Sequence, residues 1–242
     1  MAADLVLLHG FTQTGRSWDG VRERLEGGGQ RYREVAAPDL RGHGAASDAR
    51  PASFAAVTAD LDAVVAPGAL LAGYSMGGRI ALHYALARPG RVARLVLIGA
   101  SPGLADPAER AARRAADDAL ADRIERIGVG AFAEEWAALP LFAGQPPEAR
   151  AIAAAERRRN TAAGLAAALR GLGTGVMAPL WDRLGELAAV DVDLLAGERD
   201  EKFRALAGQM AARLERATLT VVPGAGHAVH LEAPGAVAAV LR

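Results

Sequence analysis

Short runs of apolar residues alternate along this chain with amphipathic segments, and this alternation limits the possible folds more than any other feature. The apolar runs are bounded by turn residues and predict strands, whereas the segments between them predict helices. We expect strands at 5–8, 32–37, 69–73, 92–99, 192–197 and 217–222, and helices at about 16–26, 54–65, 76–88, 201–214 and 232–242. Strands that alternate with helices form a parallel sheet covered on both faces, so the sequence predicts an α/β fold.

The alternation stops between Pro102 and about Leu187, where the composition is helical and rich in Ala and Arg. Open α/β sheets bind ligands at the carboxyl edge of their strands. We expect this long helical insertion to cover that edge as a cap. The predicted organisation is therefore one domain, in which 1–101 and 188–242 form the core and 102–187 form the cap.

Charge and composition exclude several classes of function. The chain has 242 residues, and its 28 basic and 28 acidic residues balance, so no net charge attracts it to nucleic acid or anionic lipid. The absence of cysteine excludes disulfides, thiol nucleophiles and cysteine-bound metals. No apolar stretch reaches the length of about 18 residues that a membrane span needs, and no basic leader precedes Leu5. We expect a cytoplasmic protein that binds neither nucleic acid nor membrane.

The segment Gly73-Tyr74-Ser75-Met76-Gly77 has the G-x-S-x-G pattern of a nucleophile elbow. It lies between a predicted strand and a predicted helix, which is the context that an elbow requires. The flanking glycines give the strained turn room. A serine in an ordinary turn is the simpler interpretation, but the context favours a nucleophile.

A nucleophilic serine needs a base, and the base needs an acid that orients it. In folds with this elbow the acid and the histidine follow the serine in that order, at the ends of late strands. Asp200 comes just after the strand predicted at 192–197, and His227 just after the strand predicted at 217–222. We therefore predict that Ser75, His227 and Asp200 form a catalytic triad; the alternative for His227 is a turn residue that caps the final helix.

An oxyanion site is expected from two backbone N–H groups. One belongs to the residue after the nucleophile, Met76, and the other to the loop after the first core strand. The segment LHGFT at 8–12 fits this loop, with Phe11 as the second donor. His9 is expected to shape the loop rather than to perform chemistry.

Arg79 occupies an unfavourable position for a cation. It lies near the start of the helix predicted at 76–88, where the helix dipole disfavours a positive charge by up to ~1 kcal/mol. Ser75 and Arg79 are four residues apart and share one helix face, so Arg79 is expected to point toward the pocket and to bind an anion there. An arginine that extends to the surface is the equally open alternative.

Seven segments together resemble one family. They are LHGFTQTGRSW (8–18), GYSMGGRIAL (73–82), ASPGL (100–104), FAEEWAALPLF (132–142), GLAAALRGLGTG (164–175), LAGERDEKF (195–203) and GAGHAVHLE (224–232). They resemble the α/β-hydrolase-fold synthases of menaquinone biosynthesis, which make 2-succinyl-6-hydroxy-2,4-cyclohexadiene-1-carboxylate (SHCHC) and release pyruvate. The similarity covers nearly the whole chain. The elbow with its trailing arginine, the W…PLF stretch and GERDxKF are specific to this family, whereas HG and G-x-S-x-G belong to the wider superfamily.

The resemblance implies an α/β-hydrolase fold. In such a fold a mostly parallel sheet is flanked by helices, and a helical cap is inserted here after the sixth strand of the superfamily. Only a few residues precede the first core strand of this chain. The leading antiparallel hairpin that is common in the superfamily is therefore expected to be missing.

The resemblance also implies roles for individual residues. The triad positions match Ser75, Asp200 and His227, and the oxyanion-hole positions match Phe11 and Met76. The positions that hold the carboxylates of the substrate match Arg79, Arg113 and Arg157, and two further pocket positions match Tyr74 and Trp136. The segment ERRRN at 156–160 has more arginines than the motif demands, so Arg158 and Arg159 stay open as alternatives to Arg157.

The implied reaction is the elimination of pyruvate from 2-succinyl-5-enolpyruvyl-6-hydroxy-3-cyclohexene-1-carboxylate, a small tricarboxylate, with no metal and no cofactor. The triad is then expected to act as a general base. Two other interpretations stay open: a carboxylesterase or C–C bond hydrolase with the same triad as nucleophile, and a small-molecule binding protein without catalysis. A monomer or a small homo-oligomer is expected.

Overall fold

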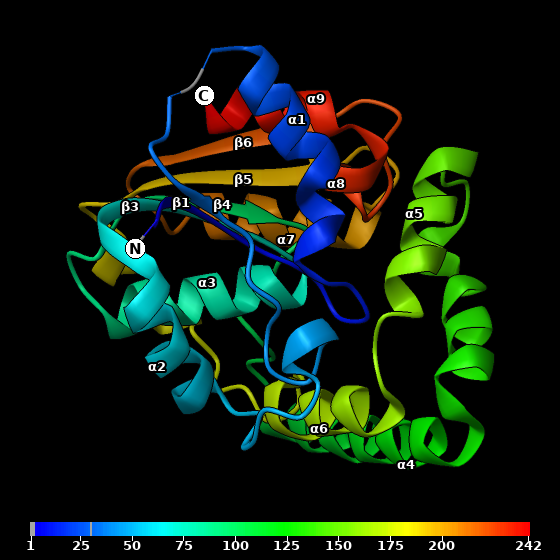
Figure 1. Cartoon of the computed structure of the whole chain (residues 1–242). Coiled ribbons are helices and arrows are strands. Elements are labelled where there is room, and N and C mark those ends of the chain that lie inside the picture. Colours follow the sequence, from blue (N-terminus) through cyan, green and yellow to red (C-terminus); the bar gives the residue numbers. More distant parts are fainter. Residues whose placement is uncertain (1–2, 30) are drawn as a thin grey trace.

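The computed structural model describes residues 3–29 and 31–242. Its strands form one six-stranded sheet in the order β2-β1-β3-β4-β5-β6, and every pair among the described strands is parallel (Figure 1). The strands are β1 (Ala3–Leu8), β2 (Val35–Ala36), β3 (Val65–Tyr74), β4 (Val92–Ile98), β5 (Asp191–Gly197) and β6 (Ala217–Val222). The predicted α/β fold with a parallel sheet is confirmed.

Helices follow or separate the strands. The α-helices are α1 (Asp19–Gly27), α2 (Phe54–Val64), α3 (Met76–Ala87), α4 (Pro107–Ala137), α5 (Pro147–Arg157), α6 (Ala162–Leu172), α7 (Glu201–Ala211), α8 (Val229–Glu232) and α9 (Pro234–Leu241). Short 3-10 helices are η1 (Gly15–Trp18), η2 (Gly44–Ala46), η3 (Pro140–Phe142) and η4 (Trp181–Leu187). Among the described residues, no helix combines the length and the apolar character that crossing a membrane requires.

Several predicted elements differ from the structure in their bounds. The strand expected at 32–37 is only the two-residue β2, and the strand expected at 69–73 begins earlier, at Val65. The helix expected at 232–242 begins two residues later as α9, with Pro234 at its first position, and the separate short helix α8 precedes it. A proline lacks the N–H that would continue a preceding helix, so the chain turns before it. His230 lies in the short helix α8.

Side chains of β1 alternate between the two faces of the sheet. Val6 and Leu8 join one core cluster with α2, α3 and α7, whereas Leu5 and Leu7 join a second cluster with α1 and α9. All four are fully buried. Figure 1 shows the corresponding layers, with α1 and α9 on one side of the sheet and α2 and α3 on the other.

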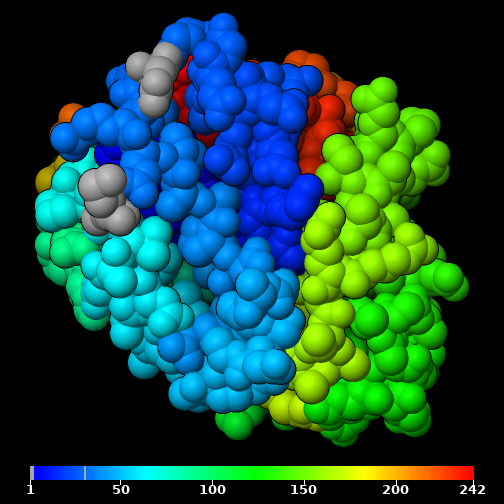
Figure 2. Space-filling model, in the orientation of Figure 1, coloured from blue at the N-terminus to red at the C-terminus, as the bar shows by residue number. Residues whose placement is uncertain are grey.

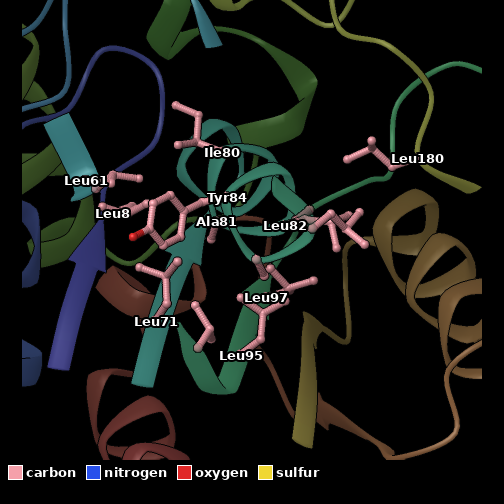
Figure 3. Close-up of a cluster of buried hydrophobic side chains, with 14 of the residues drawn as sticks. Leu8, Leu61, Leu71, Ile80, Ala81, Leu82, Tyr84, Leu95, Leu97 and Leu180 are labelled. Carbon is pink, nitrogen blue, oxygen red and sulfur yellow. The ribbon is translucent and has the colours of Figure 1, made fainter. Parts of the chain in front are cut away.

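The packing of α3 fixes the position of its first residue. Figure 3 shows side chains of α3 against residues of the neighbouring strands; the labelled α3 residues are Ile80, Ala81, Leu82 and Tyr84. Burial of a large apolar side chain contributes about 1.5–3 kcal/mol. The carboxyl end of β3 is therefore held where the chain turns sharply into α3, and this turn carries Ser75.

Residues between β4 and β5 form helices and no strand in the described structure. Helices α4, α5 and α6 lie beside the sheet and beyond the carboxyl ends of its strands (Figure 1). Helices α4 and α6 have a small apolar core of their own, made by Ala121, Ile124, Phe132, Leu165, Ala166 and Leu169. Helix α4 bends at Gly128, whose φ is 79°.

Helix α6 also approaches the main body of the protein so closely that it requires a glycine. A Cβ added at Gly171 would lie 1.5 Å from the carbonyl oxygen of Ala52. In α7, by contrast, a Cβ at Gly208 would have no heavy atom within 4 Å. A comparison of alanine substitutions at these two helical glycines therefore separates the effect of close packing from the effect of helix propensity.

We predict opposite effects of two glycine-to-alanine substitutions on the free energy of unfolding. Gly171→Ala lowers it by about 1–3 kcal/mol, because α6 must move away from Ala52. Gly208→Ala raises it by up to ~1 kcal/mol, because alanine is the better helix former. Urea unfolding followed by circular dichroism measures both, and a stabilising Gly171→Ala would show that α6 is not packed as described.

Candidate active site

Five strands end at the same edge of the sheet, and the loop after each one contributes to a single site. Chain segments after β1, β3, β4, β5 and β6 supply, respectively, Phe11, Ser75, Gly99, Asp200 and His227. Because all strands are parallel, their carboxyl ends lie together.

The turn at Ser75 has strained backbone geometry. Its φ is 51° and its ψ is −107°, a region that residues with a side chain rarely adopt. The flanking glycines make the turn possible. A Cβ at Gly73 would lie 2.4 Å from the carbonyl oxygen of Gly77, and one at Gly77 would lie 2.2 Å from that of Leu8. The elbow pattern in the sequence therefore reflects close approaches between backbone segments.

Ser75, His227 and Asp200 are joined by hydrogen bonds. Ser75 Oγ lies 3.2 Å from His227 Nε2, and His227 Nδ1 lies 2.6 Å from Asp200 Oδ2. Asp200 Oδ1 accepts a further hydrogen bond of 3.3 Å from the N–H of Phe203. With Nδ1–H donated to the carboxylate, Nε2 is free to accept the proton of Ser75. This arrangement can serve either a nucleophilic or a basic serine.

The imidazole of His227 is held on several sides. Its ring lies 4.5 Å from the ring of Phe203 and 5.2 Å from that of Tyr74. On another side is Gly99, where a Cβ would lie 2.9 Å from the Cε1 atom of His227. Sequence reasoning missed Gly99 and Phe203, although a glycine directly after a predicted strand and the phenylalanine of GERDEKF were available signals.

A cavity of about 260 Å³ opens in front of Ser75 and His227. Its other lining residues are Phe11, Met76, Arg79, Gly99, Ser101, Arg113, Leu120, Trp136, Leu141, Ala168, Leu169, Leu172, Gly173, Thr174, Lys202 and Phe203. Three of these carry a positive charge, and within the described part of the chain none of the lining residues is acidic. The cavity therefore suits an anion.

Both expected oxyanion donors border this cavity. Met76 begins α3, and Phe11 lies in the loop after β1. Within the described structure, neither N–H donates a hydrogen bond to another residue. Two unoccupied N–H groups beside a serine can stabilise a negatively charged oxygen of a bound ligand.

Arg79 reaches into the cavity wall. Its Nη1 donates a 2.8 Å hydrogen bond to the carbonyl of Leu172, the last residue of α6. Carbonyl groups at a helix C-terminus lack partners within the helix and favour a cation. The C-terminus of α6 therefore offsets the unfavourable position of Arg79 near the start of α3. Burial, together with the charge of Arg113, lowers the pKa of Arg79 to about 10.

Arg113 is held by a buried carboxylate. Its Nε donates to Asp117 Oδ1 at 2.7 Å, one turn further along α4. Asp117 is 4% exposed and also accepts from the N–H of Gly175 at 3.4 Å. The guanidinium of Arg113 is thus fixed at the rim of the cavity while half of its side chain stays exposed.

Trp136 and Tyr74 occupy different places. Trp136 lines the cavity, and its ring lies 5.3 Å from that of Phe11. Tyr74 is buried beside His227 and does not border the cavity; its ring lies 4.2 Å from that of His230 at an interplanar angle of 37°. Burial raises the pKa of the Tyr74 phenol, and the charges of Asp200 and Glu232 raise it further.

Arg157 is 5% exposed and also lies outside the residues that line the cavity. Its guanidinium carbon is 5.3 Å from the ring centroid of Phe142, whose ring is 6.4 Å from that of His227. Burial lowers the pKa of Arg157. Its buried Nε has no hydrogen-bond partner in the described structure. Arg158 is exposed, and Arg159 pairs with Glu156 at 2.9 Å.

Lys202 is a lining residue that sequence reasoning did not select. It is the only lysine in the chain and follows Asp200 by two residues. A lone lysine among many arginines was a signal that could have been used. Among the described residues, no group of three or more His, Cys, Asp or Glu side chains is arranged to hold a metal ion.

Comparisons with known proteins agree on the family. The sequence profile of the alpha/beta hydrolase family matches residues 5–240. A relative from Bacillus subtilis (strain 168) is 39% identical over 240 residues, which cover 95% of this chain and 85% of the relative. The 2-succinyl-6-hydroxy-2,4-cyclohexadiene-1-carboxylate synthase of Salmonella agona (strain SL483) is 35% identical, with 98% of this chain and 91% of the relative covered.

A solved structure gives the same result. MenH from S. aureus matches with a TM-score of 0.89 and 32% sequence identity, covering 100% of this chain and 93% of that chain. The agreement includes the helices between β4 and β5. This chain belongs to the alpha/beta hydrolase family and, within it, to the family of the 2-succinyl-6-hydroxy-2,4-cyclohexadiene-1-carboxylate synthases.

Proposed function

We propose that this protein is a cytoplasmic lyase of menaquinone biosynthesis. It eliminates pyruvate from 2-succinyl-5-enolpyruvyl-6-hydroxy-3-cyclohexene-1-carboxylate and gives SHCHC. The observation that carries this proposal is the charge of the cavity, where Arg79, Arg113 and Lys202 face the same space as Ser75 and His227 without an acidic lining residue in the described chain. The substrate is a small tricarboxylate, and the names of the relatives point to the same reaction.

Arg79 and Arg113, which line the cavity, and Arg157, which lies outside its lining beside Phe142, are proposed to hold the carboxylates of the substrate; for Arg157 this requires Phe142 to move aside. Arginine binds a carboxylate through parallel N–H donors, and such charge-assisted hydrogen bonds are the stronger ones. Trp136 forms a wall of the pocket, and Tyr74 packs against His227. Residues 102–187 act as a cap that closes over the site, whereas 1–101 and 188–242 supply the triad and the oxyanion donors.

In the proposed mechanism the triad is a general base. His227 Nε2 takes the Oγ proton while Ser75 Oγ removes a ring proton that the succinyl ketone acidifies; Asp200 stabilises the resulting imidazolium. The electrons of the broken C–H bond move onto the ketone oxygen, where the Phe11 and Met76 N–H groups stabilise the enolate. Return of these electrons forms a C2=C3 double bond in the ring, shifts the C3=C4 double bond to C4=C5 and breaks the bond between C5 and the enolpyruvyl oxygen. The leaving pyruvate enolate receives the proton held by His227.

Two other functions use the same residues differently. A carboxylesterase or C–C bond hydrolase would use Ser75 as a nucleophile, and the hydrogen-bonded geometry permits this. Neutral esters, however, make no use of three cations around the cavity. A small-molecule binding protein without catalysis needs no hydrogen-bonded Ser75, His227 and Asp200, so this interpretation leaves the most distinctive geometry unexplained.

The direct test is a pyruvate-release assay with freshly generated substrate. We expect turnover by the wild type, and loss of most activity in Ser75→Ala because the base is removed. Arg79→Ala should lower kcat/KM at least ~10-fold without unfolding the protein, since a charged hydrogen bond contributes about 1.5–3 kcal/mol.

p-Nitrophenyl acetate separates the alternatives in the same experiment. Slow ester hydrolysis beside efficient pyruvate release supports the synthase. Fast ester hydrolysis with an acyl burst and no pyruvate release would assign the site to an esterase instead. Wild-type turnover by Arg79→Ala would contradict the carboxylate-binding role of this residue.

Arg157 gives a second prediction, because a buried cation without a carboxylate partner destabilises the ligand-free protein. Arg157→Met should raise the free energy of unfolding by about 1 kcal/mol or more. The same substitution should raise KM at least ~10-fold, because a carboxylate of the substrate loses its partner. Urea unfolding and steady-state kinetics measure the two effects.

The matched control is Arg158→Met at the exposed neighbouring position. It should change the free energy of unfolding by no more than ~0.5 kcal/mol and leave KM unchanged. A rise in KM for Arg158→Met but not for Arg157→Met would contradict the assignment, because it would show that Arg158 contacts the substrate.

A further inference from the structure

Thr12 has a left-handed backbone conformation, with a φ of 70°. In the described chain, Ser75 is the other residue besides glycine with a positive φ. Each of these two residues is the sequence neighbour of a proposed oxyanion donor, Phe11 in one case and Met76 in the other. Left-handed conformations at residues with a side chain persist only where surrounding contacts enforce them.

Both polar backbone groups of Thr12 are bound by side chains from distant parts of the chain. Its N–H donates to His43 Nε2 at 3.3 Å, and its carbonyl accepts from Asn160 Nδ2 at 2.9 Å. Burial keeps the pKa of His43 well below its usual range, so its imidazole is neutral and Nε2 can accept. His43 and Asn160 thus bind the backbone N–H and the carbonyl of Thr12, respectively.

Asn160 joins three segments through one buried side chain. It is 4% exposed and follows α5. In addition to binding Thr12, its Oδ1 accepts from the N–H of Gly44 at 3.1 Å, and its Nδ2 contacts the carbonyl of Glu156 at 3.1 Å. The amide therefore connects the end of α5 with the loop after β1 and with η2.

The carboxylate of Glu156 reinforces this connection. It is 3% exposed and accepts from the N–H of Thr14 at 3.0 Å and from the Thr14 hydroxyl. Figure 2 shows the yellow-green surface of α5 and the following turn against the blue surface of the N-terminal segment. Helix α5 and the turn after it are thus attached to the loop at Thr12 and at Thr14, just after Phe11.

We propose that Asn160 is a positioning residue, which holds Thr12 in its left-handed conformation and so directs the N–H of Phe11 into the cavity. This inference rests on the proposed function, because it assigns the Phe11 N–H to an oxygen that becomes negative during the reaction. It also explains why the asparagine follows Arg157 so closely. One turn of the chain then binds a carboxylate and sets an oxyanion donor.

A purely structural role predicts something different. If Asn160 only attaches α5 to the core, its loss should lower stability and leave kcat of the folded enzyme unchanged. If it positions the Phe11 N–H, its loss should lower kcat and leave KM nearly unchanged, since an oxyanion donor acts mainly in the transition state. The ratio of the two kinetic effects therefore distinguishes the roles.

The test compares Asn160→Ala with a control that affects only structure. Removal of one oxyanion donor lowers kcat about 10²- to 10³-fold, so its misplacement in Asn160→Ala should lower kcat about 10- to 100-fold, with KM within ~3-fold of wild type. Thr161→Ala removes the neighbouring hydrogen bond that caps α6. It should lower the unfolding midpoint but keep kcat. Asn160→Asp, which lacks the donor to Thr12, replaces Asn160→Ala if that variant does not fold.

Thr12→Gly tests the backbone part of the proposal. Glycine adopts a positive φ without strain, so this variant alone should keep kcat within ~3-fold of wild type. In the Asn160→Ala background it should raise kcat at least ~5-fold, because the loop no longer needs the side chain to enforce its conformation. An unchanged kcat in both Asn160 variants, or a double variant as slow as Asn160→Ala alone, would overturn the proposal.

Failure of the proposed function is distinguished by the wild-type protein. If the wild type releases no pyruvate, the proposed function is wrong, whatever the variants show. If that protein hydrolyses p-nitrophenyl acetate, the same variants are compared on the ester, because ester hydrolysis also develops charge on an oxygen. A selective loss of kcat in Asn160→Ala would then still support positioning, and its absence would overturn it.

Discussion

The close approach of α3 to the end of β1 is the contact on which the rest of this site depends. Gly77 lies so near the carbonyl of Leu8 that no side chain fits between them, and the turn at Ser75 is strained as a result. The apolar packing of α3 against β1, β3 and β4 offsets this strain (Figure 3). The same approach brings the N-terminus of α3 beside the loop that contains Phe11, so serine and oxyanion donors share one cavity.

Charge placement explains how a protein without net charge can suit a polyanionic ligand. Arg79 is tolerated near the start of α3 because the last carbonyl of α6 accepts its hydrogen bond. Arg113 is held by the buried carboxylate of Asp117, and Arg157 is buried beside Phe142. The guanidinium groups of Arg79 and Arg113 are thus fixed by hydrogen bonds to their neighbours before a ligand arrives. Preorganised charges need little rearrangement during binding or reaction.

The sequence was sufficient to predict the α/β sheet and to place three reactive side chains at one edge of it. Ser75, Asp200 and His227 are local to strand ends, so the strand pattern alone brings them together. The positions of Tyr74 and Arg157 outside the cavity were not predictable, because they depend on how α5 and Phe142 pack in three dimensions. The left-handed conformation of Thr12 was missed for the same reason, because it depends on contacts with His43 and Asn160 far away in the sequence. Lys202, by contrast, was available as the only lysine of the chain.

The central claim is that Ser75 acts as a base and not as a nucleophile. Rapid quenching during turnover of the tricarboxylate substrate, followed by mass spectrometry of the intact protein, tests it most directly. We predict that the mass of the protein stays unchanged while pyruvate is released at the steady-state rate. An adduct on Ser75 that forms and decays at the rate of pyruvate release would contradict the claim.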